Sequence, residues 1–246
     1  MAQRYFLHLA YDGAAYHGWQ RQNNAPSVQQ TLEHALSVYF RDEVAVTGCG
    51  RTDTGVHARS YYAHFDLEDE VQDLDQARFK LNNILPADIA VFALIPVTAE
   101  AHARFDATRR AYVYHLHTAK DPFALRSAHV HYTLDLEAMN AAAAHLFEVR
   151  DFGAFCKAGS DVNNTLCDVV ESRWTREGDR WTYHIAANRF LRNMVRAAVG
   201  TLIDVGRGYT SQPEFEEILR TGKRSNAGMS APAHGLFLAD ISYPFF

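Results

Sequence analysis

The chain has 246 residues, of which 48% are hydrophobic, and a formal net charge of −5. This composition excludes a disordered chain, and the apolar runs are too short to cross a bilayer, so we expect a globular protein with no membrane partner. The negative charge disfavours a general nucleic-acid binder, which is commonly basic, but arginines near residues 104–110 and 189–196 leave a local positive groove open.

The three cysteines lie far apart along the chain. Their spacing does not match a zinc site, and an odd number does not suit a set of disulfides. We therefore predict a reducing compartment and a cytoplasmic location.

The first half of the chain has the pattern strand, helix, strand, strand, helix, strand. Apolar residues alternate along the expected strands, and a capping-box pattern at residues 27–30 opens the first helix. The predicted elements are, in order, strand 5–11, helix 28–39, strands 44–48 and 61–67, helix 75–84 and strand 89–97.

The second half repeats this order. Its predicted elements are strand 111–117, a short strand near residue 130, helix 135–147, a hairpin of strands 168–175 and 181–187, a helix capped by Asn188 that runs to about residue 205, a short helix from residue 211, and strand 236–243. Both halves fit the β-α-β-β-α-β order of a ferredoxin-like unit. We predict an α+β fold with two such halves, 1–104 and 105–246, and two such sheets laid edge to edge would leave a cleft at their junction.

The loop at residues 49–58 carries the strongest chemical signal. Gly50 and Gly55 permit sharp turns, so Asp53 is expected to project from the tip, and Arg51 two residues away favours its ionised form. A fixed carboxylate on a loop suits nucleophilic or general-base work. The structural alternative is an Asx-type turn in which Asp53 bonds to its own backbone.

Other residues allow two interpretations each. Trp19 and its polar neighbours suit either stacking on a base or filling the edge of the core. Tyr112 and Tyr114 share a strand face and are typical of a core. Arg196 has mainly apolar neighbours, so it is expected to lie within protein and to need an anion, for which Asp53 is the candidate.

Two enzyme classes are disfavoured. An aspartic protease also uses Asp-Thr-Gly, but it needs a second aspartate, and this sequence has no second copy of the triplet. A zinc hydrolase is suggested by 13 histidines, including the pairs His115/His117 and His129/His131, but these lack a familiar ligand spacing.

The segment Gly50-Arg51-Thr52-Asp53-Thr54-Gly55-Val56-His57 resembles the signature loop of the TruA family of tRNA pseudouridine synthases. The resemblance spans nearly the whole chain. It includes residues 11–13, 18–22, 83–86, 88–89, 102–105, 112–114, 190, 194–196, 199–200 and 235–238. The sequence departs from the family pattern at Ser60-Tyr61, where a Gly-Gln pair is frequent, and at Thr54, where alanine is frequent.

The resemblance implies two RRM-like halves that share one mostly antiparallel sheet, with helices packed on it and a catalytic cleft across its middle. It implies a homodimer that isomerises uridines 38 to 40 of the tRNA anticodon stem-loop. By position, Asp53 matches the catalytic aspartate, Tyr112 the active-site tyrosine, Arg196 a basic residue that pairs with the aspartate, and Arg51 an arginine that helps to displace the base.

The implied reaction breaks the N1–C1′ bond, rotates the uracil and rejoins it through C5. It needs no oxidant, reductant or group donor, so no cofactor and no metal are expected. A non-catalytic tRNA-binding or tRNA-folding protein on the same scaffold is the serious alternative, because RRM-like sheets often bind RNA without chemistry.

Overall fold

A computed structural model describes residues 2–157, 159–160 and 162–245. Its contacts divide the chain into two compact units. Unit 1 is Met1–Thr108 with Leu238–Phe246, and unit 2 is Arg109–Phe237. The division into domains 1–104 and 105–246 stays a prediction.

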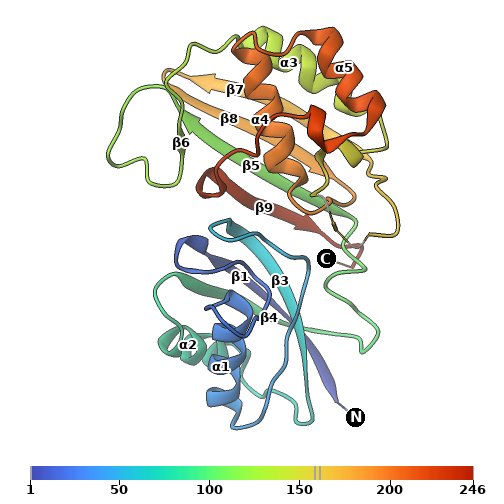
Figure 1. Cartoon of the computed structure of the whole chain (residues 1–246). Coiled ribbons are helices and arrows are strands. Elements are labelled where there is room, and N and C mark those ends of the chain that lie inside the picture. Colours follow the sequence, from blue (N-terminus) through green and yellow to red (C-terminus); the bar gives the residue numbers. More distant parts are fainter. Residues whose placement is uncertain (1, 158, 161, 246) are drawn as a thin grey trace. The chain divides into compact units, whose positions relative to one another are not determined.

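Unit 1 is built on a core sheet of antiparallel strands (Figure 1). The strand order is β4-β1-β3-β9, and a short strand, β2, pairs with β3. The elements are β1 (Gln3–Tyr11), α1 (Val28–Phe40), β2 (Thr47–Gly48), β3 (His57–Leu67), α2 (Leu74–Ile84), β4 (Ile89–Val97) and the unit 1 part of β9 (Leu236–Ser242).

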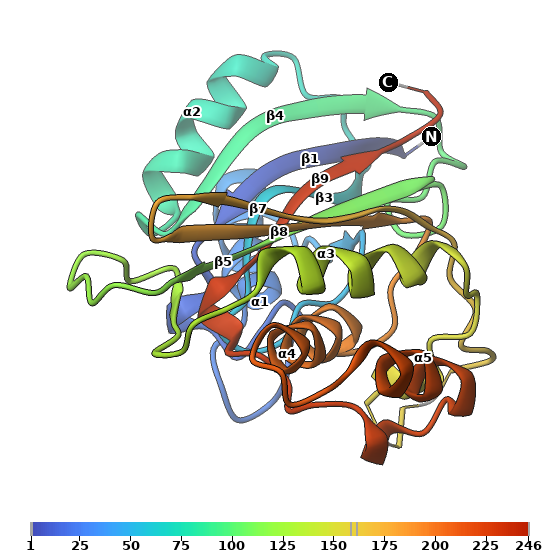
Figure 2. The same ribbon diagram turned by 90° about the horizontal axis from the view of Figure 1, so that it is seen from above.

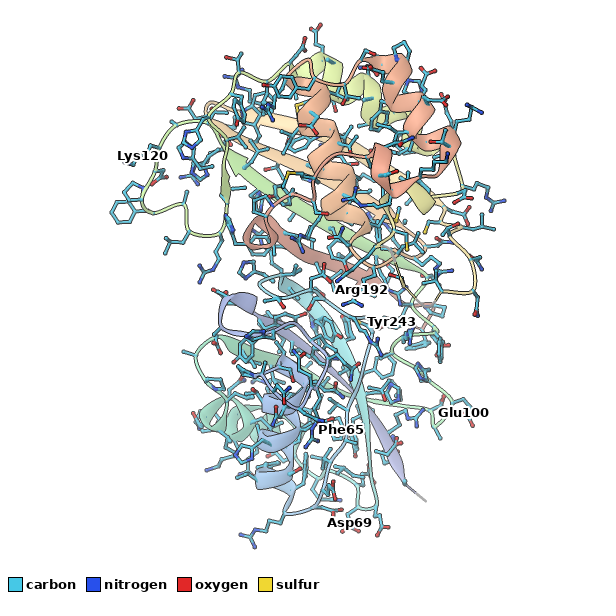
Figure 3. All side chains as sticks on the ribbon, in the orientation of Figure 1. Phe65, Asp69, Glu100, Lys120, Arg192 and Tyr243 are labelled. Carbon is cyan, nitrogen blue, oxygen red and sulfur yellow. The ribbon has the colours of Figure 1, made fainter. Side chains whose placement is uncertain are left out.

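Alternation of apolar residues decides which face of this sheet is buried. Tyr5, Leu7 and Leu9 of β1 share one face by the period of two for a strand and are almost completely buried. Phe6 on the other face is also buried. Helices α1 and α2 contact each other, and Phe65 of β3 lies beside α1 with its ring 6.0 Å from that of Phe40 (Figure 3). The predicted first half is confirmed in its element order, although β2 covers only the end of predicted strand 44–48.

Unit 2 has the sheet order β5-β8-β7, with antiparallel pairing throughout this set. The small β6 runs parallel to β5. Figure 2 shows α3, α4 and α5 gathered on one side of these strands. The elements are β5 (Arg109–His117), β6 (Ala128–His129), α3 (Leu136–Ala144), β7 (Val169–Glu177), β8 (Arg180–Ala187), α4 (Met194–Gly206) and α5 (Gln212–Thr221).

The fold class is therefore α+β with mostly antiparallel strands, as predicted. Within the described ranges, no helix is both long and apolar enough to cross a membrane.

The predicted start of the helix at Asn188 is wrong. Helix α4 begins at Met194, after Asn193, whose φ of 66° lies in the left-handed region and does not continue a helix backwards. Asn188 instead pairs with Asp168. Its side-chain oxygen accepts from the Asp168 N–H at 2.9 Å, and its Nδ2 donates to Asp168 Oδ2 at 2.8 Å. These bonds close the base of the β7–β8 hairpin.

Candidate functional site

The loop between β2 and β3 places Asp53 in a half-buried position. The Asp53 carbonyl accepts from the N–H of Val56 at 3.1 Å, which makes a turn after the aspartate. Gly55 within this turn has φ of 77°, in the left-handed region that favours glycine, whereas the φ of Gly50 lies outside that region.

The backbone of this loop is bound on both sides of Asp53 by the segment that follows β1. The Trp19 N–H donates to the Thr52 carbonyl, and the Gly55 N–H donates to the Tyr16 carbonyl, both at 3.3 Å. Gly18 has φ of 90°, and a Cβ there would lie 2.4 Å from the Thr52 oxygen, so the two segments touch backbone to backbone. The position of Asp53 thus depends on a segment more than 30 residues earlier in the sequence.

Aromatic side chains pack against one another and against the Asp53 loop. Trp19 is buried, with 2% of its surface exposed, and its ring stacks on Tyr61 at 4.0 Å between centroids. The Tyr11 hydroxyl lies 2.8 Å from the Thr52 hydroxyl, and Tyr11 also packs edge-on against Tyr61. Of the two interpretations of Trp19, the structure supports the core residue.

His57, at the end of the same loop, is a buried polar residue. Its Nδ1 lies 2.9 Å from Asp12 Oδ1 and 3.0 Å from the Gly13 backbone nitrogen. A Cβ on Gly13 would lie 2.0 Å from the Val56 carbonyl oxygen, so this contact requires glycine. The histidine of the signature loop therefore joins the end of the loop to the end of β1.

Arg51 is exposed, and its Nε donates to the side-chain oxygen of Gln20 at 3.2 Å. The guanidinium therefore stands at the surface of unit 1, on the same loop as Asp53. An exposed arginine of this kind can reach a phosphate or a base.

In unit 2, Tyr112 and Arg196 lie on regular elements. Tyr112 of β5 is half-buried, and its ring meets Phe190 edge-on at 5.0 Å. Its strand neighbour Tyr114 is fully buried, and burial raises the pKa of Tyr114 above its ordinary value, while Arg196 acts in the opposite direction. Tyr114 is thus a core residue, whereas Tyr112 keeps part of its ring accessible.

Arg196 is half-buried on the first turn of α4. Its Nε donates to the Ala231 carbonyl at 2.8 Å, and the Ala231 N–H donates to the Arg196 carbonyl at 2.9 Å. Two contacts with one residue fix both the backbone and the side chain. The expected location of Arg196 within protein is confirmed, and its pairing with Asp53 stays a prediction.

Of the three arginines at residues 189–196, Arg196 alone lies on α4. Arg189 and Arg192 precede the helix, and Arg189 donates to the Asn164 side chain at 3.1 Å. The three arginines therefore do not share one helix.

The paired histidines of unit 2 lie together. The rings of His117 and His129 stack at 5.0 Å, and His131 lies 4.0 Å from His129. In the part of the chain that the structure describes, no group of three or more histidine, cysteine or acidic side chains is arranged to hold a metal ion.

Residues 8–106 and 142–244 match a family model described as tRNA pseudouridine synthase. The chain is 48% identical over 243 residues to a protein of Parabacteroides distasonis, covering 98% of this chain and 96% of the relative. It is 48% identical to a protein of Bacteroides fragilis, with 98% and 97% covered, and 49% identical to one of Bacteroides thetaiotaomicron, with 98% and 91% covered. All three relatives carry the name tRNA pseudouridine synthase A.

The chain therefore belongs to the family of tRNA pseudouridine synthases. It is an isomerase that converts uridine to pseudouridine in tRNA, and the resemblance read from the signature loop is confirmed.

Sequence reasoning missed the way in which this loop is supported. The family pattern marks Tyr61 only as a departure, and no motif indicates the contacts of Tyr11 with Thr52 and of Asp12 with His57. A usable signal was the concentration of aromatic residues on both sides of the loop, at Tyr11, Trp19 and Tyr61.

Proposed function

We propose that the chain modifies the uridine at position 38, 39 and/or 40 in the anticodon stem-loop of tRNA, with Asp53 as the catalytic carboxylate. The observation that carries this proposal is the Asp53 loop. It presents a half-buried carboxylate on backbone that is hydrogen-bonded at Thr52 and at Gly55. Near full-length relatives named tRNA pseudouridine synthase A support the choice of RNA.

Asp53 acts on a uridine that has been turned out of its stack, at a cost of a few kcal/mol. The N1–C1′ bond breaks, the uracil rotates, and C5 bonds to C1′ as its proton leaves. Three routes are open to the carboxylate: attack on C1′, attack on C6 of the ring, or removal of a ribose proton to give a glycal. Each route needs an ionised, fixed carboxylate.

Three further residues assist Asp53 in this proposal. Arg51 occupies the space that the displaced base leaves and contacts nearby phosphates, in keeping with its exposure. Arg196 pairs with Asp53 and keeps it ionised. Tyr112 stacks on the free uracil, in keeping with its half-buried ring.

The protein works on tRNA as a homodimer in this proposal, in the cytoplasm and without a metal. Three cysteines, an odd number that lie far apart in the sequence, suit a reducing compartment. Phosphate contacts make the affinity for tRNA fall steeply with added salt.

Tritium release from tRNA labelled at C5 of uracil tests the proposal. Three transcripts are prepared, each with a single uridine among positions 38, 39 and 40, and a fourth carries cytidine at all three. We expect release from at least one of the three single-uridine transcripts and none from the fourth. Release that depends on a uridine elsewhere contradicts the assigned positions.

The same assay separates the proposal from the non-catalytic alternative. A tRNA-binding or tRNA-folding protein would bind all four transcripts and release no tritium from any of them. The presence of Asp53 favours a catalytic function over this alternative.

A further inference from the structure

Tyr61 of β3 lies beneath the Asp53 loop, and none of its surface is exposed. Its hydroxyl donates to the carbonyl oxygen of Gly50. Gly50 stands three residues before Asp53, at the point where the chain leaves β2 for the loop. The phenol thus contacts the loop from the side of the sheet.

The ring of Tyr61 is held firmly. It stacks on Trp19 at 4.0 Å and packs edge-on against Tyr11 at 5.5 Å. Gly48 leaves the room that the ring needs, because a Cβ there would lie 2.2 Å from the Tyr61 hydroxyl and 2.6 Å from Trp19. A rigid aromatic support of this kind aims the hydroxyl in one direction.

A Cβ on Gly50 would meet no described atom within 4 Å, so this part of the loop borders open space. The chain is bound on either side of it, since the Cys49 N–H donates to the Tyr62 carbonyl at 2.8 Å and the Trp19 N–H donates to the Thr52 carbonyl at 3.3 Å. Between these two bonds, the Tyr61 hydroxyl contacts the Gly50 carbonyl itself. Burial also raises the pKa of the Tyr61 phenol well above its ordinary value, so the hydroxyl keeps its proton throughout the neutral range.

We propose that Tyr61 is a positioning residue for the Asp53 loop: its hydroxyl fixes the Gly50 carbonyl, and through it the direction in which Asp53 projects. The inference rests on the proposed catalytic role of Asp53. Tyr61 does not touch the reacting atoms. It acts through the two residues that join Gly50 to Asp53, where a misplacement of about 1 Å can cost on the order of a hundredfold in rate.

The variant Tyr61→Phe removes the hydroxyl and leaves the stacked ring. We expect kcat for pseudouridine formation to fall at least about tenfold, because the carboxylate is no longer held in one orientation. The KM for tRNA should stay within about twofold, because the surface that binds RNA is unchanged. The melting temperature should fall by only about 2–4 °C, as for the loss of one hydrogen bond.

Tyr243→Phe is the matched control. Tyr243 is also a buried tyrosine of unit 1 (Figure 3), and its hydroxyl donates to the backbone carbonyl of Ala103 at 2.6 Å. This control loses the same kind of bond at a distance in sequence from the loop. We expect a similar fall in melting temperature with kcat within about twofold of the wild type. An equal fall in kcat for both variants overturns the proposal, and so does a wild-type kcat for Tyr61→Phe.

Amide hydrogen exchange gives a readout that does not depend on activity. In Tyr61→Phe, peptides that cover residues 49–56 should exchange faster than in the wild type, and in Tyr243→Phe they should not. Unchanged exchange in Tyr61→Phe overturns the positioning role even if the wild type makes pseudouridine. A wild type that makes none contradicts the proposed function, and the exchange result still decides the role of Tyr61 in holding the loop.

Discussion

The two units hold their candidate residues in different ways. In unit 2, Tyr112 lies in the β5–β8 ladder and Arg196 lies on the first turn of α4. In unit 1, Asp53 lies in a loop whose backbone is bound by Tyr16, Trp19 and the buried phenol of Tyr61. The Tyr11 hydroxyl contacts the Thr52 side chain of the same loop. Regular elements fix a side chain through repeated hydrogen bonds, whereas the loop depends on a few particular contacts, each of which can be removed singly.

The largest effect is expected at the point where two backbones meet. Gly18→Ala should lower the free energy of unfolding by about 3 kcal/mol, because it adds a left-handed φ to a contact of 2.4 Å with the Thr52 oxygen. Thermal and denaturant unfolding would measure this change. The matched control is Gly178→Ala in the β7–β8 turn, where φ is 58° and the new Cβ meets no described atom within 4 Å.

For Gly178→Ala we expect a loss of about 1 kcal/mol, from the backbone conformation alone. If both variants lose the same free energy, the close approach of residue 18 to the loop does not matter. The Asp53 loop would then depend on its particular contacts no more than the exposed β7–β8 turn does.

Arg196→Met should lower kcat about a hundredfold, because the proposed pair loses its positive partner. Steady-state tritium release measures the loss. Arg220→Met is the control, since Arg220 is an exposed residue of α5 that pairs with Glu217 at 2.6 Å. Full activity of Arg196→Met with an unchanged pH–rate profile would count against the pair.

Tyr112→Leu should lower kcat/KM about tenfold, because stacking of a base on an aromatic ring contributes about 1–3 kcal/mol. Tyr112→Phe keeps the ring and should retain most of the activity. Steady-state tritium release measures both variants. A loss of more than about a hundredfold in Tyr112→Phe would show that the phenol takes part in proton transfer instead.

The smallest effect is on the pH dependence of stability. It comes from His64, which lies on the face of the unit 1 sheet opposite Tyr5 and Leu7. Burial, followed by the charge of Arg4, lowers the pKa of His64 to about 4, and its Nδ1 accepts from the Ala103 N–H at 3.1 Å. The folded state therefore favours the neutral imidazole. Its contribution to stability is present above the unfolded pKa of about 6.5 and is lost as the pH falls from there through about 4.

His64→Gln keeps an acceptor for Ala103 and cannot titrate. Its melting temperature should fall less than that of the wild type between pH 7 and pH 4.5, by a difference of about 2–4 °C. Scanning calorimetry at several pH values measures the difference. The exposed His34→Gln is the control, and equal slopes for all three proteins would show that His64 does not contribute.

Periodicity predicted the elements on which most of the fold depends. Strand β1 follows directly from the alternation of residues such as Tyr5, Leu7 and Leu9. The β7–β8 hairpin likewise joins two predicted strands, 168–175 and 181–187. The start of α4 could not be predicted, because apolar residues continue on both sides of Asn193, and its left-handed φ is a local backbone choice. The pairing of Asn188 with Asp168 is likewise a contact between residues 20 positions apart.

The candidate site was predicted through its signature loop, since Asp53 and Arg51 stand within a few residues of each other. The contacts that support that loop were not predicted. The hydrogen bond from Tyr61 to Gly50 and the stacking on Trp19 join segments separated by 11 and 42 positions. Such contacts leave no periodic trace in a sequence, because each depends on the direction of a single side chain.

The most direct test of the account is single-turnover tritium release by Asp53→Asn, with tRNA binding measured on the same preparation. We predict a fall in rate of at least about a thousandfold and a Kd within severalfold of the wild type, because the variant keeps the shape and loses the charge. Asp69→Asn, at an exposed acid of unit 1 (Figure 3), should retain full activity. Pseudouridine formation by Asp53→Asn at a rate near that of the wild type would contradict the account.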